Sequence, residues 1–375
     1  MKDKKVEESG ISRRNFLKIS AAFGAAASMA GLPGLSAAAE AKAKKAAIAP
    51  FKQGMVNTAL GPMSPDKLGT TLMHEHFAFG YPGWYADATI APYDLQEFLK
   101  INLKEVKIAQ SHGIKTIVDA TPNDCGGRDP ELYKLLAKKT GLNIICSTGL
   151  YTDHEGAPPY FSTRAWTGQD IPKMMSELFV KEITVGIGKS GMRAGVLKLA
   201  TSPKMTPHEE NVHKAGVVAQ MATGVPIITH TEGPLPGVAQ AEFLLKQGAD
   251  PKKTMIGHVS NSKEIEYHKA ILAKGVYIAF DRIGLDIITP TAVNVKNIAD
   301  LCKLGFTEKI MLSHDTVNWV GRPMVWPEQA KAGFANWHID HISKDVVPAL
   351  KAQGITDEQI KIMMVENPKR LFMGA

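Results

Sequence analysis

From about residue 55 onward, short apolar runs alternate with longer stretches in which apolar and polar residues follow a helical period. The apolar runs are rich in Val, Ile and Thr and have the length of buried strands. They predict strands near 69–75, 115–120, 143–149, 194–200, 225–230, 254–258, 276–280 and 309–314. The stretches between them predict helices near 94–112, 129–140, 171–188, 206–223, 237–248, 262–274 and 291–304. Eight strands that alternate with helices are typical of a single-domain α/β fold, the (β/α)8 TIM barrel.

Residues at the expected helix ends agree with this pattern. Asp94, Thr206 and Ser262 suit N-cap positions, and glycines stand where most of the helices should stop. The last 40 residues also look helical. The structural alternative is a doubly wound open sheet. Its dinucleotide-binding version has no support, because no Gly-x-Gly-x-x-Gly opens the first helix.

The first 39 residues form a separate segment. They contain Ser12-Arg13-Arg14-Asn15-Phe16-Leu17-Lys18, then an apolar run of small residues over 19–30, and Ala37-Ala38-Ala39. This order resembles a twin-arginine export signal, with a disordered basic tail or a short membrane anchor as alternatives. The run is too short and too rich in Ala and Gly to span a membrane stably.

The signal implies a domain organisation and a location. We expect a signal peptide at 1–39, a flexible Ala/Lys leader at 40–54 and one barrel domain at 55–375. Twin-arginine signals direct folded proteins, often with a cofactor loaded, to the export machinery. The resemblance therefore predicts a bacterial protein that is periplasmic or secreted.

Composition and charge exclude several classes of protein. A hydrophobic fraction of 44% and a charged fraction of 22% are those of a soluble globular chain, and three cysteines exclude a disulfide scaffold. The first 39 residues carry six basic and three acidic side chains, which is +3 of the net charge of +7, and Lys42, Lys44 and Lys45 follow in the leader. The nearly balanced body gives no indication of nucleic-acid binding. No other stretch reaches ~18 apolar residues, so we expect no stable membrane insertion.

Chemically active side chains stand at the carboxyl ends of the predicted strands, where α/β barrels build their active sites. The ordered set is His74 and His76 on the first strand, Lys198 on the fourth, His230 on the fifth, His258 on the sixth and Asp315 on the eighth. Residues i and i+2 of a strand point to one side, so the first two imidazoles can reach a single metal.

The donor set is too large for one tetrahedral site with an open position. It suits two divalent cations about 3.5–4 Å apart, which could be zinc, manganese, cobalt or iron, with zinc favoured. A free lysine is an ammonium at neutral pH, whereas a lysine carboxylated by carbon dioxide can bridge two cations. The alternatives for the lysine are a structural ion pair and a Schiff-base nucleophile. Each histidine alone could also be an ordinary core residue.

These residues resemble the binuclear metal site of the phosphotriesterase family of the amidohydrolase superfamily, from about Leu72 to Phe372. Supporting segments are Thr148-Gly149-Leu150-Tyr151, Ile227-Ile228-Thr229-His230, Met255-Ile256-Gly257-His258, Asp281-Arg282-Ile283-Gly284-Leu285-Asp286 and Glu366-Asn367-Pro368. The resemblance implies a hydrolase that attacks ester bonds with a metal-bridging hydroxide.

The resemblance also implies one role for each residue. His74, His76 and Asp315 would hold the more buried metal, and His230 and His258 the more exposed one. Lys198, as N6-carboxylysine, and the hydroxide would bridge both, and Asp315 would accept the proton released in the reaction. Family members often carry an aspartate three residues beyond the histidine of strand 6, and this sequence has Asn261 there. Asn261 indicates a slower or rerouted proton exit, or a simple structural substitution.

Two residues favour a lactone or carboxylic ester as the substrate. Tyr151 matches a tyrosine that lactonase-like members place beside the metals, and Arg282 stands where phosphotriesterases proper usually have a histidine. The alternatives are a packed aromatic for Tyr151 and a structural partner of a carboxylate for Arg282. Trp319 and Trp326 are candidates for an apolar wall of the substrate site.

Other functions remain open at this point. An organophosphate phosphotriesterase would use the same metals, and a non-catalytic metal-bearing binding protein would keep them without turnover. A mononuclear deaminase is disfavoured, because Lys198 has a bridging role only between two metals. The resemblance further implies a homodimer, and a small-molecule ester and the twin-arginine machinery as partners.

Overall fold

The computed structural model describes residues 51–84, 94–156, 158–233, 235–317 and 332–374, all of which belong to one compact unit, Ala49–Ala375. Trp319 and Trp326 lie outside the described residues. Within the described residues, no helix is both long and apolar enough to cross a membrane.

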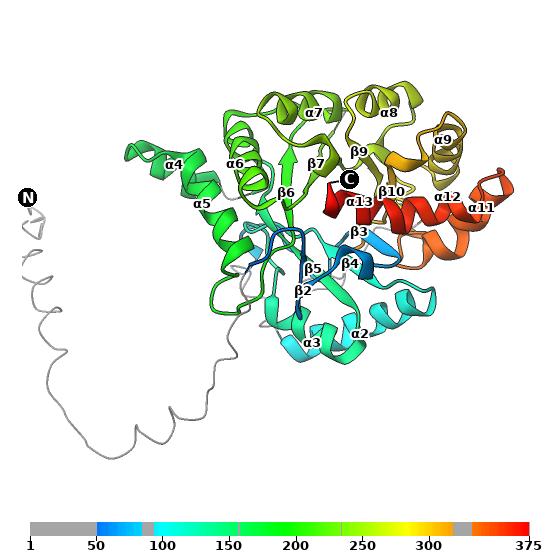
Figure 1. Cartoon of the computed structure of the whole chain (residues 1–375), viewed down its shortest axis with the longest axis horizontal. Helices are drawn as coiled ribbons and strands as arrows, with labels where there is room; N and C mark the ends of the chain where they lie inside the picture. Colours follow the sequence, from blue (N-terminus) through cyan, green and yellow to red (C-terminus); the bar gives the residue numbers. More distant parts are fainter. Residues whose placement is uncertain (1–50, 85–93, 157, 234, 318–331, 375) are drawn as a thin grey trace, which may run out of the picture. The chain divides into compact units, whose positions relative to one another are not determined.

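Eight parallel strands form one sheet in the order in which they occur along the chain, with helices around it (Figure 1). The strands are β3 (Thr71–Glu75), β4 (Thr116–Asp119), β5 (Asn143–Leu150), β6 (Val196–Thr201), β7 (Ile227–Thr231), β8 (Thr254–Ile256), β9 (Tyr277–Phe280) and β10 (Ile310–Leu312). The first and last strands meet just beyond their carboxyl ends, where Asp315 N–H donates to His74 C=O (3.0 Å) and His76 N–H to Thr316 C=O (2.8 Å). The sheet is therefore a nearly closed barrel, and all eight predicted strands are confirmed.

Helices connect the strands and cover the barrel. They are α2 (Leu95–Ser111), α3 (Pro130–Thr140), α4 (Pro158–Trp166), α5 (Ile171–Thr184), α6 (Pro207–Thr223), α7 (Gly237–Lys246), α8 (Ile265–Leu272), α9 (Thr291–Lys303), α11 (Val347–Ala352), α12 (Asp357–Lys361) and α13 (Asn367–Met373). Two π-helical turns, η6 (Ile342–Val346) and η7 (Ile362–Glu366), continue directly into α11 and α13. The seven predicted helices and the helical end of the chain are confirmed.

The helix ends follow from particular side chains. Asp94 accepts hydrogen bonds from the first turn of α2, and Thr206 forms a capping box with Glu209 at the start of α6. The N-cap prediction for Ser262 is wrong. Ser262 ends a 3-10 turn, η4 (Val259–Asn261), and α8 begins after Glu264.

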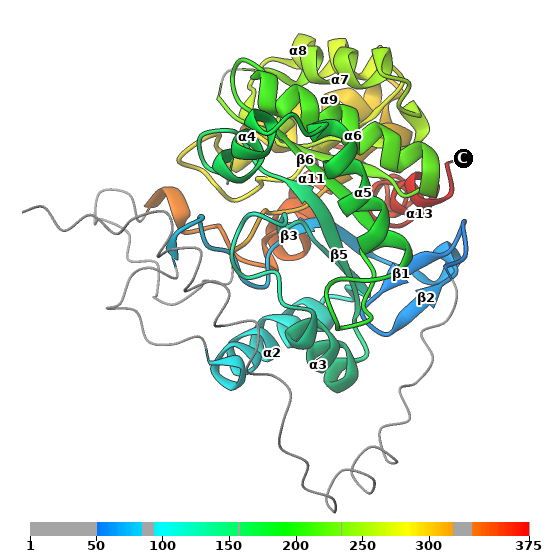
Figure 2. The ribbon, with the colours of Figure 1, turned by 90° about the vertical axis from the view of Figure 1, so that its left-hand side faces the viewer.

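A hairpin and one helix were not predicted. An antiparallel hairpin of β1 (Val56–Thr58) and β2 (Gly61–Met63) precedes the barrel, and α4 lies between β5 and α5. Three-residue strands are too short to show a period of two in the sequence. The hairpin lies beside β5 (Figure 2), where Ala59 N–H donates to Ile144 C=O (2.8 Å).

The buried apolar residues form two layers. Alternate residues of the strands, among them Val196 and Met311, fill the barrel interior together with Val56 of the hairpin and Phe372 of α13. The residues between them, such as Leu197 and Ile310, pack against the helices instead. These interior apolar side chains fill the amino end of the barrel. The inward positions at the carboxyl end are polar instead.

Candidate active site

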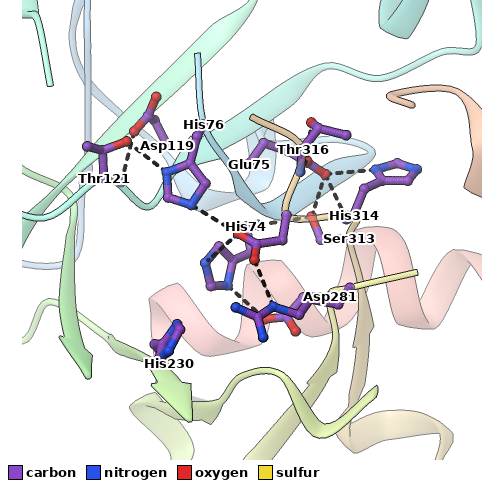
Figure 3. A network of polar contacts seen from close by, with 12 residues as sticks. His74, Glu75, His76, Asp119, Thr121, His230, Asp281, Ser313, His314 and Thr316 are labelled. Carbon is purple, nitrogen blue, oxygen red and sulfur yellow. Dashed lines mark hydrogen bonds and ion pairs between the residues drawn. The ribbon is translucent and has the colours of Figure 1, made fainter. Parts of the chain in front are cut away.

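His74 and His76 lie where the first and last strands close the barrel (Figure 3). Asp315 completes a group of three possible metal ligands with them. Nε2 of His76 lies 3.0 Å from Oδ1 of Asp315, and Nε2 of His74 lies 3.4 Å from the same oxygen. His74 is fully buried, and the other two residues are at most 8% exposed. The structure thus brings together residues that the sequence placed on the first and the last strand.

Lys198, His230 and His258 come to the same place from β6, from β7 and from beyond β8. Nζ of Lys198 lies 2.6 Å from Nε2 of His74. Nε2 of His258 lies 2.8 Å from Nδ1 of His230 and 3.7 Å from Oδ2 of Asp315. All six residues that the sequence predicted as metal ligands therefore form one buried cluster.

Asp281 directly follows β9 and orients two of the histidines. From the sequence it was recognised only as part of a motif, without a role of its own. Its Oδ2 accepts from Nδ1 of His74 (2.7 Å), and its Oδ1 accepts from both the backbone N–H (2.6 Å) and Nδ1 (3.0 Å) of His258. A carboxylate on Nδ1 directs the Nε2 lone pair toward a metal.

Glu75, between the two histidines of the first strand, points the other way and holds the segment after β10. Its Oε1 accepts from Ser313 Oγ (2.8 Å) and His314 N–H (3.0 Å), and its Oε2 accepts from the N–H (2.7 Å) and hydroxyl (2.5 Å) of Thr316. These bonds surround Asp315, whose φ of 57° is in the left-handed region that most residues avoid. The buried carboxylate therefore stabilises a strained backbone at a predicted ligand.

The donor set fits divalent cations. The Nδ1 atoms of His74 and His258 are bonded to Asp281 and that of His76 lies 2.8 Å from the Thr121 hydroxyl, so their Nε2 atoms converge. Burial lowers the pKa of His74 and of His258 well below its ordinary value, which favours the neutral imidazole that binds metals. Asp315 is buried and its pKa lies well below the ordinary value, and metal ions would compensate its negative charge.

Electrostatics keep Asp315 ionised. Burial alone would raise its pKa, but His74, His76 and Arg282 outweigh burial and hold the pKa of Asp315 well below its ordinary value. Nε of Arg282 donates to Oδ2 of Asp315 at 3.0 Å. Arg282 is therefore the partner of a carboxylate, as the structural alternative for this residue predicted. It also lines the cavity.

Tyr151 stands beside the same cluster. Its hydroxyl lies 3.3 Å from Nδ1 of His230, and its ring packs edge-on against that imidazole. Burial raises the pKa of Tyr151 well above its ordinary value, so the hydroxyl keeps its proton and is a hydrogen-bond donor. The other ring nitrogen of His230, Nε2, lies 2.8 Å from Oε2 of Glu232.

A cavity of about 610 Å³ opens over these residues. The lining includes His74, His76, Lys198, His230 and Asp315 at the bottom, and an apolar and aromatic wall of Phe79, Tyr81, Trp84, Leu285, Ile288 and Trp337. A polar floor under an apolar wall is typical of a small-molecule site. Phe79, Tyr81 and Trp84 of this wall come from the segment after the first strand.

Comparisons with known proteins agree with this geometry. The model of the "Phosphotriesterase family" matches residues 54–372. A "Phosphotriesterase homology protein" of Mycobacterium tuberculosis is 38% identical over 84% of this chain and 97% of the relative. An "Aryldialkylphosphatase" of Saccharolobus solfataricus is 35% identical over 81% of this chain and 95% of the relative. A crystal structure of a mutant PTE-like lactonase of Deinococcus radiodurans is 42% identical, covers 84% of this chain and 99% of that chain, and superposes with a TM-score of 0.82.

The start of the chain matches a second family. Residues 10–30 match the "TAT (twin-arginine translocation) pathway signal sequence", so the protein is exported to the periplasm or secreted. The folded unit, with its barrel and its cluster of histidines and aspartates, is that of the first family along nearly its whole length. The chain therefore belongs to the phosphotriesterase family and is a metal-dependent hydrolase of ester bonds.

Proposed function

We propose that this enzyme hydrolyses lactones or related carboxylic esters at a centre of two divalent metal ions, with zinc favoured. His74, His76 and Asp315 would hold one ion, and His230 and His258 the other. Lys198 would join them as N6-carboxylysine. The support is the convergence of five of these side chains at the bottom of one cavity, with Nε2 of His258 2.8 Å from Nδ1 of His230.

The environment of Lys198 supports its carboxylation. The side chain is 1% exposed, and burial lowers its pKa to about 8, so an appreciable share of the amine is unprotonated near neutral pH. An unprotonated amine adds to carbon dioxide and loses one proton, which leaves a carbamate with one negative charge. The carbamate would replace a buried cation by an anion, which suits a site for two cations.

The residues around the metal centre would have separate roles in the reaction. Bound metal ions would supply a hydroxide nucleophile near neutral pH and polarise the ester oxygen. Asp315, kept ionised by His74, His76 and Arg282, is placed to take up the proton that the reaction releases. Arg282 keeps that carboxylate in one orientation through its 3.0 Å bond. The aromatic wall would exclude water from the substrate.

The hydroxyl of Tyr151 is the observation that favours a carboxylic ester. It is a neutral donor 3.3 Å from Nδ1 of His230 and within the cavity, where it can donate to an ester or lactone oxygen. Such a donor can stabilise the charge that develops on the carbonyl oxygen during attack.

A substrate profile of the metal-reconstituted enzyme tests the proposal. We expect the highest kcat/KM on lactones, lower values on aryl esters and the lowest on aryl phosphotriesters. Tyr151→Phe should lower kcat/KM for lactones more than for phosphotriesters, with Tyr160→Phe, a change at an exposed tyrosine, as the control. Phosphotriester turnover far above lactone turnover would establish the organophosphate hydrolase instead. No turnover of any ester, with both metals bound, would indicate a binding protein.

A further inference from the structure

A second group of histidine and aspartate side chains lies outside the active-site cavity. His338, His341 and Asp345 each offer one ligand atom, and these atoms all lie within 4.8 Å of one another. The two histidines precede the π-helical turn η6, and Asp345 lies within it. π-Turns interrupt helices frequently at functional sites, because they displace side chains from the regular helical positions.

The hydrogen bonds of His341 require a cation at one of its nitrogens. The Thr291 hydroxyl donates its single proton to Oδ1 of Asp286 (2.7 Å), so it can only accept from Nε2 of His341, which lies 3.1 Å away. Nε2 therefore carries a hydrogen, and a neutral imidazole then has its lone pair on Nδ1. That lone pair faces Oδ2 of Asp345 at 2.8 Å, so two acceptors oppose each other.

Either a second proton or a metal ion can resolve this contact. His341 is 3% exposed, so a second proton would place a charge on a buried imidazole, which costs free energy. A metal ion between Nδ1 and the carboxylate satisfies both acceptors without it.

The surroundings suit a bound cation. Oδ1 of Asp340 lies 2.5 Å from Nδ1 of His338, and a carboxylate on one ring nitrogen commonly orients a metal-binding imidazole. Oδ2 of Asp340 lies 3.7 Å from Nε2 of His112, at the end of α2. Two imidazoles with one carboxylate favour zinc and similar transition metals over calcium or magnesium.

We propose that His338, His341 and Asp345 bind one divalent transition metal ion of the zinc type, separate from the active site. The ion would fix the position of His341, whose Nε2 lies 3.1 Å from the Thr291 hydroxyl at the start of α9. Asn336 already donates to Oδ2 of Asp286 (2.6 Å), and Trp337 and Leu285 both line the active-site cavity. The site would therefore stabilise one wall of the substrate pocket from behind.

Metal stoichiometry of the full chain tests the proposal. The protein is stripped with a chelator, refilled with zinc and passed through a desalting column, and zinc per chain is then measured by mass spectrometry. We expect His338→Ala and Asp345→Asn each to hold one equivalent of zinc less than the wild type. His208→Ala, which removes an imidazole on α6, is the matched control and should keep the wild-type stoichiometry.

A variant of the active site separates this inference from the proposed function. Lys198→Ala should lose zinc from the cavity and retain the equivalent at His338, His341 and Asp345. Adding Asp345→Asn to it should remove that equivalent. Zinc contents of both cluster variants equal to the wild type would overturn the inference and leave His341 as an imidazolium paired with Asp345. If His338→Ala does not fold, Asp345→Asn decides the question, since it keeps the size of an exposed side chain.

Discussion

Asp281→Asn should weaken metal binding at the active site while leaving every proposed ligand in place. The carboxylate presently accepts on both oxygens, from His74 on one side and from two donors of His258 on the other. An asparagine has one oxygen, and that oxygen should keep the side with two donors. Its NH2 group then faces Nδ1 of His74, which must give up its hydrogen to accept, so Nε2 becomes protonated and cannot bind a metal.

The size of the effect follows from the number of imidazoles that depend on Asp281. Loss of an orienting partner typically costs 10–100-fold in metal affinity, or about 1.4–2.7 kcal/mol for each histidine. We expect about 100-fold for the ion at His74, whose imidazole changes tautomer. About tenfold or less is expected for the ion at His258, which keeps its acceptor.

Competition against a chromophoric chelator measures both dissociation constants in metal-free protein refilled with zinc. Asp300→Asn, on the surface of α9, is the control for a change of charge and should leave both constants unchanged. Dissociation constants within about threefold of the wild type in a folded Asp281→Asn protein would refute the reasoning, because the tautomers of His74 and His258 would not depend on this carboxylate.

Three further outcomes are expected. Lys198→Ala should lose most bound metal and hydrolysis, measured without added carboxylate, and full activity in this variant would exclude a bridging lysine. Glu75→Gln should lose at least one bond from a backbone N–H to a charged acceptor, about 2–3 kcal/mol, and lower the Tm by several degrees relative to a Glu266→Gln control; an unchanged Tm would contradict this. Burial lowers the pKa of His213 and of His268 to about 4. Both therefore stay neutral in the folded protein while the unfolded chain takes up protons below about pH 6.5. Stability of the metal-free protein should then be full above pH 6.5 and fall by roughly 3 kcal/mol per histidine as the pH decreases to 4. Denaturant titrations at several pH values measure this, and a flat profile would show that these imidazoles are not kept neutral.

The sequence predicted the barrel and the ligand cluster because both follow from local patterns. Eight apolar runs fix eight strands, and a histidine, lysine or aspartate after a strand must reach the same rim. The supporting residues were harder to predict. Asp281 and Glu75 look like ordinary acidic residues, and their roles depend on contacts across the barrel with His258 and with Thr316. The partners of His341 depend in the same way on packing between segments 50 residues apart.

The closure between the first and last strands has a consequence for the order of events during synthesis. Nε2 of His76 and Oδ1 of Asp315 are 239 positions apart, so no nascent chain that lacks the last strand can bring them together. Such a distant contact forms late, because a long loop must lose its conformational freedom before the contact contributes any stability. On the proposed ligand set, metal capture therefore coincides with completion of the barrel. A ribosome-bound or truncated chain would remain metal-free. Only molecules with a complete barrel would then hold the metal ions before export by a route that carries folded proteins.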